Sequence, residues 1–207
     1  YGKTTDLIAM GGAQYVHTFD KCLFMPSDLT AGLEYNRDRL KDNMWGYDRH
    51  TDQTVNIYSA FLQNEWKNER WSILVGGRLD KHNMVDNIIF SPRANLRFNP
   101  TQNINLRLSY SSGFRAPQAF DEDMHSENVG GTVAMIERTK NLKEEKSQSF
   151  SASADIYHRF GAFQTNFLIE GFYTKLTDVF VLGEPYNRGD GVLVKLRSNG
   201  PGAKVVG

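Results

Sequence analysis

The chain has 207 residues, of which 40% are hydrophobic, and its 24 Lys+Arg balance its 24 Asp+Glu to a formal net charge of +0. A neutral chain without a Lys/Arg block excludes nucleic acid as a partner, and the single cysteine, Cys22, excludes an internal disulfide. No run approaches the ~18 consecutive apolar residues of a membrane helix, which excludes a helical membrane protein but leaves a membrane barrel, whose strands alternate.

Alternation of apolar and polar residues dominates the chain and predicts antiparallel strands rather than helices. Within five of the strands the apolar stripe holds no charged residue, whereas the opposite face holds arginines, carboxylates, serines and asparagines. The predicted strands are, in chain order, 7–19, 29–36, 54–66, 71–80, 93–98, 103–111, 149–156, 163–176, 191–198 and 203–207.

Short and long connections follow one another along the chain. The short ones are 21–27, 67–70, 99–102, 159–162 and 199–202, and the long polar ones are 36–53, 81–89, 113–147 and 178–191. In an up-and-down sheet this order gathers all short turns at one end and all long loops at the other. That asymmetry is typical of outer-membrane barrels, with short periplasmic turns and long extracellular loops.

Aromatic residues flank the short connections, where a membrane-interface girdle would lie, although aromatic pairs also close hairpins in soluble sheets. Periodicity alone does not decide which face points outward. The loop asymmetry and the girdle favour an antiparallel up-and-down transmembrane β-barrel, an all-β fold, with its arginine-rich face toward the lumen. The residues predicted to face lipid are Trp71, Ile73, Val75, Leu79, Leu96, Phe98, Ile104, Leu106, Leu108, Tyr110, Phe150 and Ile156.

The long connection after residue 113 contains the candidate ligand residues. The stretch "DEDMHSEN" from Asp121 gathers carboxylates around a histidine, which could bind a cation or a metal chelate, although most charge runs are solvated loops. Arg115 either faces a ligand or pins the loop by bonding backbone carbonyls and Asp121 or Glu122, and we favour the second role. The candidates for ligand contact in this loop are Arg115, Asp121, Asp123, His125 and Glu127.

Motifs of catalysis are missing from the sequence. There is no nucleophile elbow, phosphate loop, zinc-protease helix or dinucleotide fingerprint. We therefore expect no enzyme, no catalytic residue, no cofactor and no resident metal.

Several stretches, in order, carry a family likeness. "SSGFRAPQAFDED" from Ser111 resembles a strand end at the extracellular mouth of TonB-dependent outer-membrane receptors. "NLKEEKSQSF" from Asn141 is similar to the start of the family's next strand, with Glu144 where the family has proline. The stretches "GGRLDKH", "EGFYTKLTDVFVL" and "NGPGAKVVG" resemble further barrel segments, so that the likeness runs from about Val55 to Gly207. The loop motif consists of Gly113, Phe114, Arg115, Ala116 and Pro117.

The resemblance implies a barrel of about 22 strands, closed by a separate N-terminal plug domain, of which this chain would hold about ten strands. The signal peptide, the plug, the TonB-contacting segment and the closing strands would then lie elsewhere, and residues 1–207 would be part of one barrel domain. The implied function is energised uptake of a scarce nutrient (iron siderophore, haem, cobalamin or oligosaccharide) across the outer membrane of a Gram-negative bacterium. The implied partners are outer-membrane lipids, the TonB complex through the plug, and the nutrient at the extracellular loops. Two alternatives stay open, a passive porin or adhesive barrel without a plug and a soluble all-β binding module.

Overall fold

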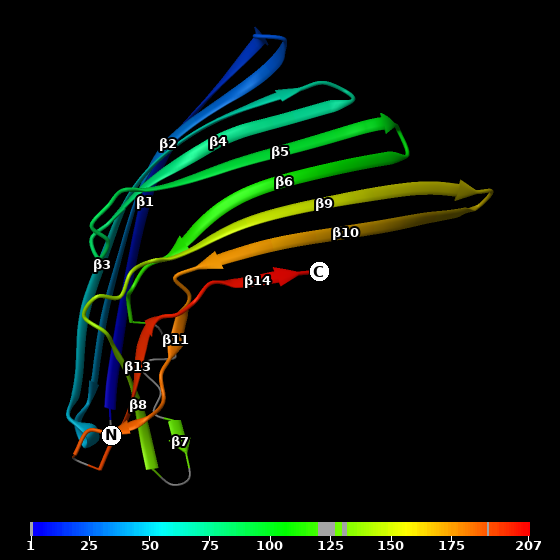
Figure 1. Ribbon diagram of the computed structural model, residues 1–207. Coiled ribbons are helices and arrows are strands. Elements are labelled where there is room, and N and C mark those ends of the chain that lie inside the picture. Colours follow the sequence, from blue (N-terminus) through cyan, green and yellow to red (C-terminus); the bar gives the residue numbers. More distant parts are fainter. Residues whose placement is uncertain (1, 120–126, 130–131, 190) are drawn as a thin grey trace.

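The structure is a computed structural model that describes residues 2–119, 127–129, 132–189 and 191–207. Nearly all of these residues are in strands, and nine strands form one antiparallel sheet in the order β1-β2-β3-β4-β5-β6-β9-β10-β14 (Figure 1). Its strands are β1 (Gly2–Cys22), β2 (Met25–Met44), β3 (Arg49–Lys67), β4 (Trp71–His82), β5 (Ile89–Thr101), β6 (Ile104–Arg115), β9 (Glu145–Phe160), β10 (Phe163–Thr177) and β14 (Ala203–Val206). The predicted all-β, antiparallel architecture is confirmed, and within the described residues the sheet is open rather than closed.

A second, smaller sheet forms from the two longest connections. Its path is β11-β13-β8-β7, and β12 also pairs with β13. The strands are β7 (Glu127–Val129), β8 (Thr132–Arg138), β11 (Phe180–Leu182), β12 (Tyr186–Asn187) and β13 (Leu193–Asn199). Because β8 and β13 come from different connections and pair in parallel, this small sheet ties the two connections together.

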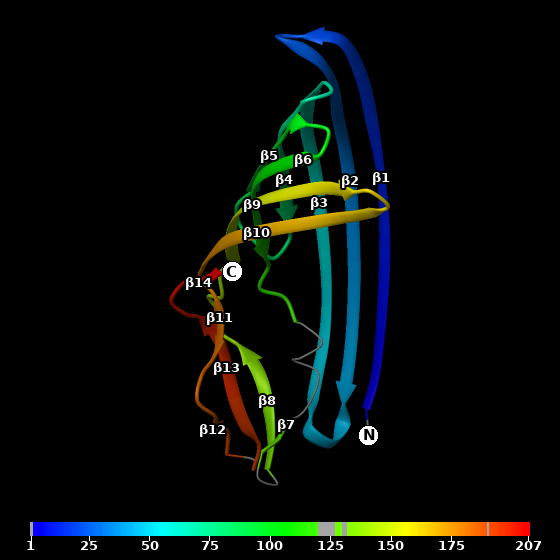
Figure 2. The same ribbon diagram turned by 90° about the vertical axis from the view of Figure 1, so that its right-hand side faces the viewer.

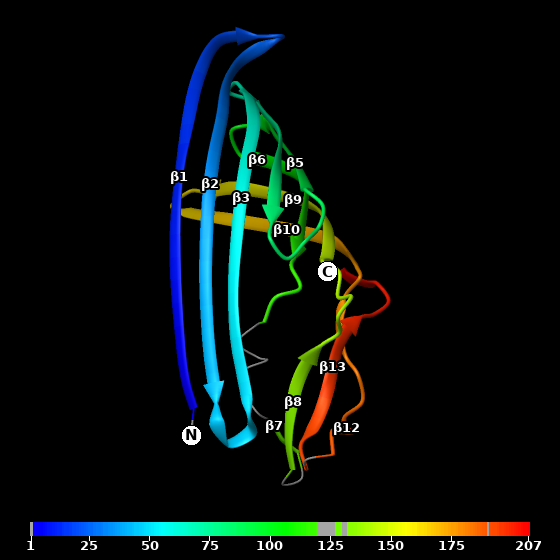
Figure 3. The same ribbon diagram turned by 90° about the vertical axis from the view of Figure 1, so that its left-hand side faces the viewer.

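The short turns lie at one end of the large sheet and the long connections at the other, as the sequence predicts (Figure 1). The β9–β10 turn is built on Gly161, whose φ of 58° is a left-handed conformation that glycine adopts without strain. Figures 2 and 3 show that β9 and β10 run across the direction of β1–β3, so the sheet curves as well as twists.

The prediction of a long loop at residues 36–53 is wrong. Strand β2 continues to Met44, the 3-10 helix η1 (Trp45–Tyr47) makes the turn, and β3 begins at Arg49. Polar pairs hold this extension, since Asp42 accepts hydrogen bonds from Thr4 at 2.6 Å and Arg49 at 2.7 Å. The segment is polar because it extends the hairpin beyond the apolar stripes and its side chains bond to polar partners, as Asp42, which is 3% exposed, does with Thr4 and Arg49.

Strand register places the predicted lipid-facing residues on a single face. Val75 lies opposite Ala94, Ala94 opposite Tyr110, and Tyr110 opposite Phe150, while the Trp71 and Phe98 rings stack at 4.1 Å. Half of the Val75 surface and 54% of Leu108 are exposed, so no layer formed by the described residues covers this face. Such a face needs a surrounding of low polarity or a partner.

Both faces of the large sheet are hollowed. On the polar face a cavity of about 480 Å³ is lined by Gln14 of β1, Glu34 of β2, Arg78 of β4 and Ser111 of β6. On the apolar face a hollow of about 790 Å³ lies over β4, β5, β6, β9 and β10, with Val75 and Phe150 in its lining. What distinguishes the two faces is therefore their polarity.

Buried apolar side chains are few and lie near the long connections instead of under the middle of the sheet. Among the described residues they are Leu40, Val55, Val85, Ile89, Ala116, Met135, Val192 and Val194. No helix in the described ranges is long and apolar enough to cross a membrane.

Candidate functional site

The loop motif after β6 anchors the first long connection. Ala116 is 6% exposed and packs with Val85 and Ile89, and the Phe114 ring covers this cluster. The His82 ring meets Phe114 edge-on at 6.5 Å. The motif thus fixes the point where the chain leaves the sheet, which explains why the alternating pattern stops there.

His82 completes this anchor with hydrogen bonds from both ring nitrogens. Its Nδ1 accepts the Met84 N–H at 3.1 Å, so the ring proton lies on Nε2 and is donated to Gln118 Oε1 at 3.3 Å. The side chain is 1% exposed. From the sequence alone, a histidine without a paired partner is expected to be solvated or to line the lumen, and the burial of His82 under the loop corrects this expectation.

Arg115 contacts the second long connection. Its guanidinium carbon lies 5.7 Å from the centroid of the Phe180 ring, within cation–π range. The Phe180 N–H in turn donates to Glu145 Oε2 at 2.9 Å. Of the acidic partners suggested for Arg115, Asp121 and Glu122 lie outside the described residues, and sequence did not suggest Phe180, which lies 65 positions further on.

Glu144 stands where the family pattern has proline, at the start of β9. Burial raises the pKa of this carboxyl, but its own backbone N–H and the Lys146 ammonium, 3.0 Å away, outweigh that effect and lower the pKa overall. A charged Glu144 therefore holds Lys146 at the beginning of the strand, where a proline would fix the backbone by its ring.

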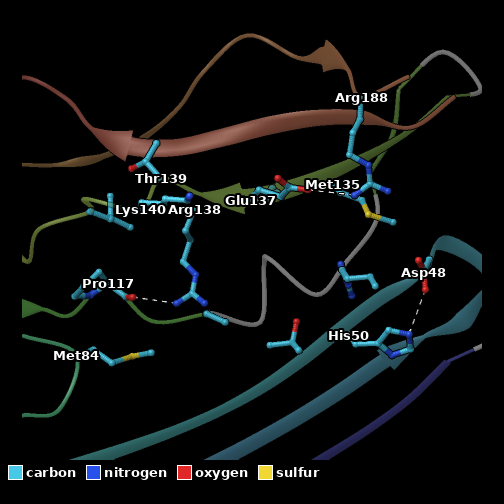
Figure 4. A pocket seen from close by; sticks show the side chains of 15 residues that line it. Asp48, His50, Met84, Pro117, Met135, Glu137, Arg138, Thr139, Lys140 and Arg188 are labelled. Atoms are coloured by element: carbon cyan, nitrogen blue, oxygen red, sulfur yellow. Dashed lines mark hydrogen bonds and ion pairs between the residues drawn. The ribbon is translucent and has the colours of Figure 1, made fainter. Parts of the chain in front are cut away.

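A cavity of about 720 Å³ lies between the tip of the β2–β3 hairpin and the small sheet (Figure 4). Figures 2 and 3 show the small sheet standing opposite the lower ends of β2 and β3. The charged residues that line this cavity, within the described part of the chain, are Asp48, Arg49, His50, Glu137, Arg138, Lys140 and Arg188. Four of these side chains form two pairs, in which Arg188 lies 3.2 Å from Glu137 and His50 lies 3.4 Å from Asp48. The volume is in the usual range for a small-molecule site.

Gln53 fastens the loop to the sheet beside this cavity. It is 6% exposed, and its Oε1 accepts the Ala119 N–H at 2.7 Å and Arg138 Nη1 at 3.0 Å. The same Arg138 nitrogen donates to the Pro117 carbonyl at 3.0 Å, as Figure 4 shows. One side chain of β3 therefore joins the start of the connection to the end of β8.

Replacing Gln53 with alanine should loosen residues 116–119, because it removes the shared acceptor of two donors, one of them charged. Hydrogen bonds to charged groups contribute about 1.5–3 kcal/mol, so amide exchange at Ala119 should accelerate roughly tenfold or more. Hydrogen exchange on the intact protein in detergent measures this. The matched control is Gln63→Ala on the same strand, because Gln63 Oε1 is buried without a hydrogen-bond partner in the described part. Equal protection in both variants would contradict the role of Gln53.

The structure describes only some of the residues predicted to contact a ligand. Asp121, Asp123 and His125 lie outside the described residues, and Glu127 is the first residue of β7. Across the described ranges, no three His, Cys, Asp or Glu side chains gather in a way that could hold a metal ion. Gln53, Arg138 and Arg188 were not predicted, because no sequence pattern marks residues that meet only when distant connections pair.

The comparisons with known proteins agree with this architecture. The family model described as TonB dependent receptor-like, beta-barrel matches residues 3–203. No curated protein matches the chain in sequence.

Solved structures match over nearly the whole chain. The siderophore receptor PirA from Pseudomonas aeruginosa is 16% identical with a TM-score of 0.77, and the alignment covers 100% of this chain and 39% of that one. A double mutant of the Serratia marcescens hemophore receptor HasR, in complex with its hemophore HasA and heme, is 13% identical with a TM-score of 0.78 and the same coverage. The FrpB iron transporter from Neisseria meningitidis is 16% identical with a TM-score of 0.63, and the alignment covers 98% of this chain and 32% of that one. The chain therefore spans well under half the length of these structures.

Proposed function

The chain belongs to the TonB-dependent receptor β-barrel family, and from this premise we propose that the intact protein takes up a scarce nutrient across the outer membrane of a Gram-negative bacterium. The family consists of transport receptors rather than enzymes. The barrel supplies walls and loops, and energy arrives through TonB acting on a plug outside residues 1–207. No chemical step is assigned to any residue of this chain.

The observation that carries the proposal is the division of the sheet into two faces. An apolar face that no described residue covers suits outer-membrane lipid, and a polar face with arginines and serines suits a filled or wet lumen. A passive porin or an adhesive barrel would share these faces. The soluble alternative requires the apolar faces of two sheets to pack together, whereas the apolar face of the large sheet leaves Val75 51% and Leu108 54% exposed.

We place ligand recognition at the long connections, on the cavity between the hairpin tip and the small sheet. The cavity offers arginines, a lysine, a histidine and two carboxylates to a polar ligand. The related structures are named for siderophore, heme and iron. Among the four nutrient classes, we therefore test iron carriers first.

The test is uptake by the intact gene product in a host that lacks its own iron receptors. Cells receive radioactive iron as ferric enterobactin, as a neutral ferric trishydroxamate or as haem, and a parallel set receives cyanocobalamin or maltotriose. Accumulation of one probe that requires both the gene and TonB supports the proposal. Entry of a probe without TonB would identify a passive pore, and absence of the protein from the outer membrane would overturn the proposal.

A further inference from the structure

Two lysines lie opposite each other on the apolar face of the large sheet, at the end where the long connections lie. Lys175 of β10 and Lys204 of β14, which we call the lysine pair, are direct cross-strand partners, and both are exposed. Lys175 follows Tyr173 by two positions, and Tyr173 is in the same cross-strand row as Val75 and Phe150. Alternate residues of a strand share a face, so the lysine pair lies one step beyond the apolar stripes on the face proposed to meet lipid.

No carboxylate among the described residues neutralises the lysine pair. Lys146 of β9, on the same face, shows the compensated case, because its ammonium lies 3.0 Å from Glu144. Neither Lys175 nor Lys204 forms an ion pair in the described part of the chain. Like charges directly opposite each other destabilise a sheet, so an anion that bridges the two ammonium groups would stabilise this one.

Hydrogen-bond donors continue the same row beyond the lysine pair. Gln148 of β9 is the cross-strand neighbour of Lys175, and Ser112 of β6 is the neighbour of Gln148. A hollow of about 340 Å³ lies beside them, with Ser112, Lys146 and Gln148 in its lining. The row therefore offers two ammonium groups, an amide and a hydroxyl to an anionic group.

The larger hollow of the apolar face, about 790 Å³ in volume, adjoins this row. Tyr110 lines both hollows, and Tyr173, two positions from Lys175, lines the larger one. Ala152 and Gly171 are cross-strand partners within its lining, and their small size contributes to the hollow. It lies over five adjacent strands, which is roughly 19 Å across at the usual strand spacing, so several acyl chains can lie in it side by side.

We propose that the lysine pair and the larger hollow form one binding site for a phosphorylated lipid with several acyl chains, in the outer leaflet of the outer membrane. The two ammonium groups hold a phosphate, with Gln148 and Ser112 as further donors, and the acyl chains lie in the hollow. Tyr110 and Tyr173 lie between the two parts, where amphipathic rings suit the boundary of hydrocarbon and headgroup. The proposal rests on the proposed function only in placing the sheet in the outer membrane with its long connections outside.

Native mass spectrometry of the intact protein in detergent tests the phosphate. The probe is diphosphoryl lipid A, and the comparisons are the same lipid without its phosphates, phosphatidylglycerol and inorganic phosphate. Each lysine near an anionic lipid strengthens binding about fivefold, so the phosphates should lower the dissociation constant of lipid A at least about tenfold. Equal binding of the two forms of lipid A overturns the proposal. Equal binding of phosphatidylglycerol, or displacement of lipid A by the same concentration of inorganic phosphate, also overturns it, since the site would then select any anion.

Removing the lysine pair tests the assigned residues. K175Q/K204Q should bind diphosphoryl lipid A about tenfold more weakly and should bind the lipid without phosphates as the wild-type protein does, which a general loss of structure would not do. The matched control is K3Q/K21Q, which removes the same charge from two exposed lysines of β1 and should leave both affinities unchanged. Wild-type affinity of K175Q/K204Q for diphosphoryl lipid A would mean that a group outside residues 1–207 neutralises the pair, and the proposal would be wrong.

Gly171→Leu tests the acyl part of the site. A Cβ at Gly171 would meet only the Gly207 carbonyl oxygen, at an ordinary 3.7 Å, so the strand can accept a leucine that occupies part of the hollow. Binding of both forms of lipid A should weaken about threefold or more, whereas Ala13→Leu, opposite Leu33 on the same face but outside the hollow, should change neither. Unchanged binding by Gly171→Leu would contradict the acyl site. Uptake by the wild-type protein is scored separately, so failure of the receptor function is distinguishable from failure of the lipid site.

Discussion

Replacing Val75 with arginine in the intact receptor is expected to lower the free energy of unfolding by about 2–4 kcal/mol, the cost of a cation at the lipid-facing midplane of a barrel. Val75 lies near the middle of β4 on the apolar face, is 51% exposed, and has Asn64 and Ala94 as its cross-strand neighbours. None of these can neutralise a guanidinium. Reversible unfolding in urea from lipid vesicles measures the difference.

The matched control for this variant is Ser149→Arg. Ser149 precedes Phe150, which lies in the same cross-strand row as Val75, but its side chain is on the polar face, between Ser111 and Thr174. An arginine there has no charged cross-strand neighbour, so its cost should stay under about 1 kcal/mol, as expected for a substitution away from core, caps and buried charges. Equal costs at the two positions would mean that the apolar face does not meet lipid.

Replacing Gly76 with alanine should destabilise the sheet by roughly 1–3 kcal/mol, the usual cost of overpacking. A Cβ at this position would lie 2.5 Å from the Cβ of Gln63 and 2.8 Å from the carbonyl oxygen of Leu62. The second of these is backbone, so β3 and β4 would have to move apart. Unfolding in urea again gives the difference.

Gly113→Ala serves as the comparison, because a Cβ there meets only the Ser147 hydroxyl at 3.3 Å, and a serine can rotate away. Both glycines are in strands, so the loss of backbone freedom in the unfolded chain is similar for the two variants. A stability change as large for Gly113→Ala as for Gly76→Ala would show that close strand contact is not the cause.

Most of the large sheet is predictable from the sequence because each strand has its own two-residue period. The stripes from Trp71 to Leu79 and from Ile104 to Tyr110 identify their faces without any knowledge of the neighbouring strands, and the registers place them together. The same reasoning fails at residues 36–53, where polar side chains on both faces imitate a loop although the backbone continues as a hairpin. The polarity of a segment depends on its surroundings and does not decide whether the segment is a strand.

The candidate site is much less predictable, because it is made by contacts between segments that are far apart in the chain. Gln53 meets Arg138 across 85 positions, and Arg188 meets Glu137 across 51. His82 shows the opposite problem, since a lone histidine at a strand end gives no sign that a loop will bury it. The contacts depend on which connections pair, and periodicity does not carry that information.

The parallel pairing of β8 with β13 has a consequence for how these receptors can change over evolution. Five consecutive pairs, from Leu193 with Ala134 to Arg197 with Arg138, join residues of two different connections that are 59 positions apart in the chain. An insertion or exchange in one connection alone would leave the backbone groups of the other without their partners. The two connections thus form one structural unit, and grafting them onto another barrel would require moving both at once.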